Sequence, residues 1–111
     1  MISQLINSYL YVLKAFGQEV NFVKAIDDSV IKVLIAPYNR YNEDLNMHIE
    51  FNVQSFIISK NSIGDYKPVN GDRFEYGDKT YIVQNIETDF IGSKIVGYKV
   101  EGVPQWELLH L

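Results

Sequence analysis

From Val20 towards the end of the chain, apolar side chains recur at every second position in short runs separated by turn residues. This alternation is typical of strands that bury one face and expose the other. No run with a helical period lies between these strands, which disfavours the β-α-β order of a parallel nucleotide-binding sheet. The pattern therefore predicts a mainly β domain with antiparallel strands.

We expect about six short strands within residues 19–103. They are predicted at residues 19–26, 30–36, 55–59 (where alternation that resumes at His48 leads into a more fully buried strand), 72–76, 80–87 and 94–101. Asp27-Asp28-Ser29 offers a tight turn after the first strand, and Gly77-Asp78-Lys79 and Gly92-Ser93 offer two more. Pro37 is predicted to end the second strand, because proline cannot donate a hydrogen bond to a ladder.

Residues 2–16 precede the strands and carry apolar side chains at spacings of three and four, which predicts an amphipathic helix. The apolar stripe consists of Ile2, Leu5, Ile6, Tyr9, Val12, Leu13 and Phe16. Tyr11 is expected to point outward. Ser3 is the expected N-cap, and Gly17 stands where a left-handed C-cap is expected.

These elements predict a single domain over residues 1–111, of the α+β class but mainly β. An N-terminal helix packs on one opening or face of a small antiparallel β-barrel or sandwich. A long exposed loop, residues 37–48, lies between the second and third strands, and residues 104–111 form a C-terminal tail. A chain of this length buries enough surface for a core without disulfides or metals.

The composition excludes several kinds of catalytic site and metal site. There is no cysteine, so thiol catalysis, disulfides and thiolate metal sites are excluded. His48 and His110 stand far apart in the sequence, and no catalytic triad or metal-ligand spacing includes either of them. We therefore predict no enzyme activity, no cofactor and no metal.

Charge and glycine spacing argue against nucleic acid and phosphate ligands. The formal net charge is −4 with only ten Lys and Arg residues, whereas phosphate-backbone binding needs clustered basic residues. Gly71-Asp72 and Gly77-Asp78 lack the spacing of a phosphate-binding loop, and each glycine precedes an acid that repels phosphate. We interpret both pairs as turn residues.

No apolar run approaches the roughly 18 residues that a membrane span requires, and residues 1–6 lack the features of a secretory signal. A soluble protein made in a cytoplasm is the expectation.

Binding residues are expected in the loop and in the tail. The loop contains residue types that are enriched at binding hot spots, together with two acids, and the tail contains a large apolar set that either folds back or docks on a partner. The candidate protein-interaction residues are Tyr38, Arg40, Tyr41, Glu43, Asp44, Trp106, Leu108 and Leu109.

One order of elements resembles a known family. An apolar strand is followed by a connection, Gly-Asp, a short strand, a glycine turn and a strand with an aromatic residue two before a valine. The residues that carry it are 56–59, 67–83 and 97–104. This order resembles the head-tail joining (head completion) proteins of tailed bacteriophages, the lambda type in particular.

The resemblance implies a structural virion protein, a small barrel or sandwich that self-associates into a ring between portal and tail. It implies portal or adaptor proteins and tail proteins as partners, and a location in the virion after assembly in the bacterial cytoplasm. The loop and tail are the parts that such proteins order on binding. Two alternatives stay open: a tail-side protein, either tail terminator or tube subunit, and a small barrel adaptor in a bacterial complex.

Overall fold

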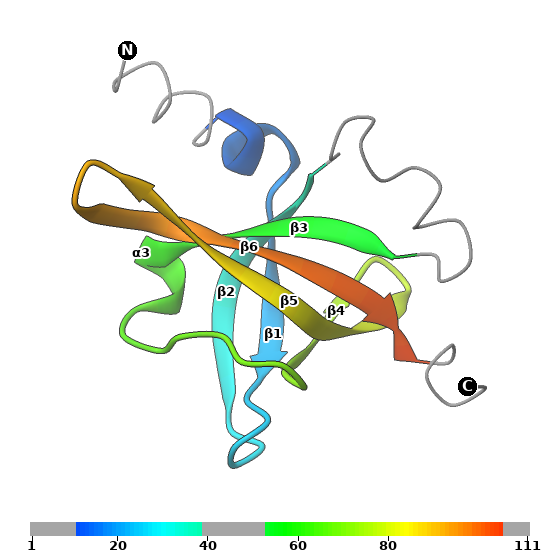
Figure 1. Cartoon of the computed structure of the whole chain (residues 1–111). Helices are drawn as coiled ribbons and strands as arrows, with labels where there is room; N and C mark the ends of the chain where they lie inside the picture. The colour runs from blue at the N-terminus through cyan, green and yellow to red at the C-terminus, as the bar shows by residue number, and fades with distance from the viewer. Residues whose placement is uncertain (1–10, 39–52, 106–111) are drawn as a thin grey trace.

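The structure, a computed structural model, describes residues 11–38 and 53–105 (Figure 1). Its elements are β1 (Gln18–Val23), β2 (Val30–Tyr38), β3 (Gln54–Ser59), the single helical turn α3 (Lys60–Ile63), β4 (Arg73–Tyr76), β5 (Lys79–Ile91) and β6 (Lys94–Pro104). A helix over residues 11–16 precedes β1.

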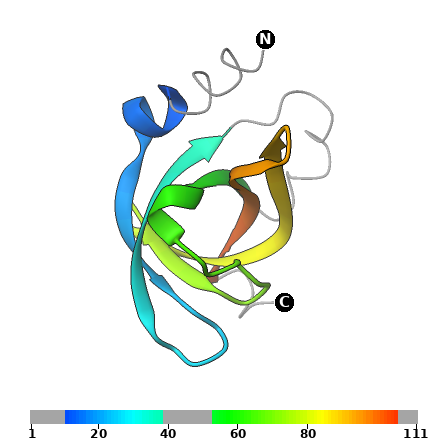
Figure 2. The same ribbon diagram turned by 90° about the vertical axis from the view of Figure 1, so that its left-hand side faces the viewer.

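The six strands form one closed barrel in the order β1-β2-β3-β6-β5-β4, in which β4 returns to β1. Every neighbouring pair is antiparallel. Figure 2 shows the strands curving around a common interior. The predicted mainly β class with a helix and six antiparallel strands is confirmed, and of the two layouts considered the chain adopts the barrel.

The pairings around the barrel differ greatly in length. β5 and β6 form a long hairpin, and β1 pairs with β2 along its whole length. The closing pair is much shorter, because β1 and β4 are in register only at Phe22↔Phe74 and Val23↔Arg73. We call this β1–β4 pairing the seam.

Aromatic rings fill the interior behind the seam. Phe22 and Phe74 stack with ring centroids 6.1 Å apart, and Phe56 meets Phe74 edge-on at 4.9 Å. Tyr81 contacts both Phe56 and Phe74, at 5.0 and 5.6 Å. Such pairs contribute about 0.5–1.5 kcal/mol each beyond the burial of their area. Gly102 keeps space for the cluster, since a Cβ there would lie 3.0 Å from the ring of Phe56.

The N-terminal helix packs on the outer wall of the barrel. Leu13 is buried against Ala36 of β2 and Ile57 of β3, whose neighbours along each strand point into the interior. The predicted orientations of Leu13 and Tyr11 are confirmed. The prediction for Phe16 is wrong, because the chain turns away at Gly17 and leaves the Phe16 ring 58% exposed.

Gly17 has a different role from the predicted one. It does not adopt a left-handed backbone conformation. A Cβ at this position would lie 2.0 Å from the carbonyl oxygen of Leu13 and 3.0 Å from the side chain of Leu34. Glycine is therefore needed for the close approach of helix and barrel wall.

Two predictions at the ends of the first hairpin are wrong. β1 ends at Val23, and Ile26 lies in the following turn with its side chain 80% exposed. β2 does not end at Pro37 but continues to Tyr38, with Pro37 opposite Phe56 of β3. β1 begins opposite Ile35, so at Pro37 the strand has a partner on one side only, where a missing N–H is tolerated.

The same reasoning applies at the end of β6. The predicted tail begins at Pro104, but Pro104 is buried and is the last residue of β6, opposite Tyr81. The pairing of β6 with β3 has already ended at Gly102, so Pro104 also needs only one partner strand. The turns at Gly77-Asp78 and Gly92-Ser93 are confirmed, although β5 extends beyond its predicted end to Ile91.

We predict that Tyr98→Phe leaves the barrel equally stable or makes it more stable by up to about 1 kcal/mol. Tyr98 is 2% exposed, and its hydroxyl has no hydrogen-bond partner in the described part of the chain. Urea unfolding measures the change, and Tyr11→Phe, at an exposed ring, is the control. A loss of stability well above that of the control would contradict the prediction.

Candidate functional site

Only one of the residues that the sequence predicts for protein contact lies in the described part of the chain. Tyr38 is the last residue of β2 and pairs with Ser55, so its assignment to the loop is wrong. The other seven candidates lie outside the described residues: Arg40, Tyr41, Glu43, Asp44, Trp106, Leu108 and Leu109. The proposed role of all eight residues in protein contact stays a prediction.

The most elaborate polar arrangement in the described chain centres on the fully buried carboxylate of Asp72. Its Oδ1 accepts the backbone N–H of Ala25 at 2.7 Å, and its Oδ2 accepts the N–H of Val69 at 2.8 Å. The Tyr66 hydroxyl donates to both oxygens, at 2.9 and 3.0 Å. We call Asp72, Tyr66, Val69 and Ala25 the Asp72 cluster.

Tyr66 is held in place from several sides. Its ring meets Phe22 edge-on with centroids 6.3 Å apart, and the ammonium of Lys24 lies 4.7 Å from the ring centroid. Partial burial and the hydrogen bond to Asp72 raise the pKa of Tyr66 from the ordinary tyrosine value near 10 to about 12. The phenol of the folded chain therefore stays protonated, and continues to donate, in the range above pH 10 where an ordinary tyrosine ionises.

The main chain beside Asp72 joins the cluster to β5. Gly71 donates its N–H to the carbonyl of Val83 at 2.9 Å, and Val83 donates to the carbonyl of Asp72 at 2.8 Å. Gly71 has a φ of +100°, and the Asp72 N–H donates to the carbonyl of Val69 at 3.2 Å, so the predicted turn is confirmed; the burial of the Asp72 carboxylate is what the sequence did not predict. A buried carboxylate needs several donors, and only the folded chain brings them together.

The Asp72 cluster shapes an apolar surface at one end of the barrel. Because Ala25 and Val69 bind the same carboxylate, the β1–β2 turn and the connection after α3 lie side by side. Ile26, Val30 and Val69 are exposed there, by 80%, 55% and 43%. We call these three residues the tip patch. Sequence reasoning missed it, because alternation assigned Ile26 to the buried face of a strand.

A second apolar surface lies at the opposite end of β1. Tyr11 and Phe16 are exposed on the N-terminal helix, which ends just before β1 begins (Figure 1). Tyr76 of β4 donates its hydroxyl to the carbonyl of Phe16 at 3.2 Å, which fixes the helix end to the barrel. We call Tyr11 and Phe16 the helix-end patch.

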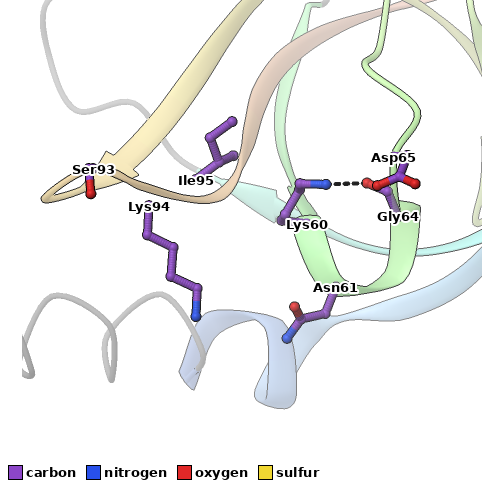
Figure 3. Close-up of a pocket in the computed structure, with 7 residues that line it drawn as sticks. All are labelled: Lys60, Asn61, Gly64, Asp65, Ser93, Lys94 and Ile95. Carbon is purple, nitrogen blue, oxygen red and sulfur yellow. Dashed lines mark hydrogen bonds between the residues drawn. The ribbon is translucent and has the colours of Figure 1, made fainter.

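An open hollow of about 490 Å³ lies between α3 and the β5–β6 turn. Figure 3 shows the residues that line it, which belong to α3, the β5–β6 turn and the residues just after each: Lys60, Asn61, Gly64, Asp65, Ser93, Lys94 and Ile95. The ammonium of Lys60 donates to the carbonyl of Gly64. The lining can make hydrogen bonds and ion pairs to a partner, but it contains no histidine beside Ser93 to act as a base.

The described residues contain no group of three His, Asp or Glu side chains placed to hold a metal ion. Nor does any helix in these ranges have the length and apolar character needed to cross a membrane. The large apolar side chains that the described chain exposes are those of the tip patch and the helix-end patch, at opposite ends of the barrel, and Phe90 of β5. Burying such surfaces against another protein is favourable by about 25 cal/mol per Å² of apolar area.

No known protein family, curated protein or solved structure matches the chain.

We predict that Asp72→Asn lowers the free energy of unfolding by about 1–3 kcal/mol, because an amide nitrogen then faces a backbone or phenol donor. Asp78→Asn is the matched control, since Asp78 follows Gly77 in the same Gly-Asp pattern but is exposed. This control is expected to change stability by less than about 0.5 kcal/mol. Urea unfolding of the two variants measures both, and equal effects would contradict a special role for Asp72.

We also predict that the free energy of unfolding falls at alkaline pH, because Tyr66 ionises less readily in the folded chain. The pKa of Tyr66 is about 12 in the folded chain, against a value near 10 in the unfolded chain. Its contribution is therefore complete below pH 10 and is lost as the pH rises towards 12, because the unfolded state ionises first. Unfolding midpoints across this range should fall less steeply for Tyr66→Phe than for the parent chain. Parallel pH profiles would contradict the assignment.

Proposed function

We propose that this chain is a structural subunit of the head-tail junction of a tailed bacteriophage or prophage. In this proposal several copies form a ring between portal and tail, and the protein has no catalytic role. The observation that carries the proposal is the presence of two different apolar patches at opposite ends of a closed barrel.

A subunit with two unlike contact surfaces suits assembly. When one surface of a copy binds a different surface on its neighbour, the contact is heterologous, and repeated contacts of this kind generate rings. The tip patch and the helix-end patch differ in residues and in supporting elements. They give each copy one surface for one neighbour and another surface for a second.

The resemblance to head completion proteins adds a second line of support. The stretch that carries much of it, residues 67–83, contains Val69 and Asp72 of the Asp72 cluster, the whole of β4 and the turn into β5. In this chain the Gly-Asp pair of that stretch supports the barrel beside the tip patch. The proposal therefore links the residues that carry the resemblance to the formation of one contact surface.

We predict that deleting the gene from a phage or lysogen that carries it leaves DNA-filled heads and free tails that do not join. A plasmid copy should restore joined particles, as counted by electron microscopy, and virion proteomics should detect the chain. Genes for portal, capsid or tail proteins should lie beside it. Normal particles in the deletion strain would overturn the proposal, and joined heads with malformed tails would favour the tail-side alternative.

Complementation with variants tests the contact surfaces. Ile26→Ser and Val69→Ser change exposed side chains, so the barrel should fold while joined particles fall by about tenfold or more. Lys67→Ser, at an exposed polar position in the same connection, should complement normally. Complementation at the level of the parent by both patch variants would show that the tip patch is no interface.

The predicted role of the loop has its own test. Deleting residues 39–46 removes no residue of β2 or β3, which end at Tyr38 and begin at Gln54. The variant should keep the circular dichroism spectrum of a folded barrel and should fail to join heads to tails. Normal joining by a folded deletion variant would refute the loop assignment.

A further inference from the structure

Asn70-Gly71 is the one Asn-Gly pair in the sequence. Both residues are exposed, in the turn that leads into Asp72. Asparagine before glycine is chemically labile, since glycine has no side chain to hinder attack on its neighbour. The backbone nitrogen of Gly71 attacks the side-chain carbonyl carbon of Asn70. The bond from that carbon to the amide nitrogen breaks, ammonia leaves, and a succinimide forms. Water then opens the ring to aspartate or isoaspartate.

In the folded chain, the backbone nitrogen of Gly71 is held in a hydrogen bond and is not free to attack. The reaction needs the nitrogen of Gly71 without its proton, but this N–H donates to the carbonyl of Val83 at 2.9 Å. Removing the proton would break that hydrogen bond, and the return bond from Val83 to Asp72 fixes the same stretch of backbone. The φ of +100° at Gly71 is held by this pairing. Reaction therefore requires the turn to separate from β5.

The product would disturb the Asp72 cluster. Isoaspartate at position 70 inserts one extra carbon into the main chain between Val69 and Asp72. These two residues are joined twice, from the Val69 N–H to the Asp72 carboxylate at 2.8 Å and from the Asp72 N–H to the Val69 carbonyl at 3.2 Å. A longer main chain cannot keep both contacts at these lengths.

We propose that Asn70 is a deamidation site controlled by the Gly71–Val83 pairing. The closed barrel suppresses the reaction, a chain that opens here reacts, and the isoaspartate product weakens the cluster that kept the turn closed. The amount of isoaspartate at position 70 thus increases with the time that a chain has spent with this turn separated from β5. This inference does not depend on the proposed function.

The rate of deamidation tests whether the closed barrel suppresses the reaction at Asn70. The full-length protein is incubated at mildly alkaline pH, folded or in urea, and digested with trypsin. Because Pro68 blocks cleavage after Lys67, one peptide, residues 61–73, contains both Asn70-Gly71 and the comparison pair Asn61-Ser62. Asn70 should react at least about tenfold more slowly in the folded protein, as expected when reaction requires local opening. Equal rates in the two states would overturn the proposal.

Variants test whether the Asp72 cluster protects Asn70 from deamidation. Tyr66→Phe removes one donor to Asp72 and should raise the rate at Asn70 in the folded protein at least threefold, while Tyr11→Phe should not. No acceleration in a folded Tyr66→Phe variant would show that the cluster does not control the turn. A change of about this size is expected when one hydrogen bond to Asp72 is lost.

The product itself provides the last test. Ion exchange separates the deamidated fraction, which contains the isoaspartate form together with the aspartate form, from the parent, because both products carry one additional negative charge. Asn70→Asp is the matched control, since it has the same charge and a main chain of normal length. The isoaspartate form should melt at a lower temperature than Asn70→Asp. Equal melting temperatures would overturn the claim that the product weakens the cluster.

Discussion

The carboxylate of Asp72 lies where the barrel has the least main-chain pairing. The seam between β1 and β4 consists of two residue pairs, and the hydrogen bond from Ala25 to Asp72 extends it past the end of β1. On the other side, the backbone around Asp72 is paired with Val83 of β5. The side chain of Asp72 thus connects the first hairpin to the connection after α3, and the backbone of Gly71 and Asp72 connects both to the last hairpin. Breaking a buried arrangement of this kind leaves several donors unsatisfied at once, and we therefore expect its loss to destabilise the barrel.

Much of the fold could be predicted from the sequence because strand periodicity is a local signal. The buried positions of Val20, Phe22 and Phe74 follow directly from alternation, and the turns follow from glycine and aspartate. The error at Pro37 has an identifiable cause. The rule that proline ends a strand assumes partners on both sides, whereas Pro37 lies where one neighbour strand is missing, and Pro104 is accommodated at the end of β6 in the same way. Only the register of the whole barrel reveals that.

The candidate site was less predictable, because burial of a polar group is a property of the tertiary structure. Gly71-Asp72 and Gly77-Asp78 look alike in the sequence, and one aspartate is buried with three donors while the other is exposed. A local signal existed in Tyr66 and Val69, which stand six and three residues before Asp72, but nothing marked Ala25 as the third partner. Alternation likewise misplaced Ile26, since it gives no information on where a strand stops.

The distance along the chain between the partners at the seam has a consequence for synthesis. Ala25 and Asp72 are separated by 47 residues, and the backbone that holds Asp72 pairs with Val83, which is translated later still. Contacts so far apart in sequence form late, because a long stretch of chain must be ordered before they are made. On the ribosome the first hairpin therefore emerges without its closing partner. The nascent barrel stays open, with the ring of Phe22 in β1 uncovered, until β4, β5 and β6 have left the exit tunnel.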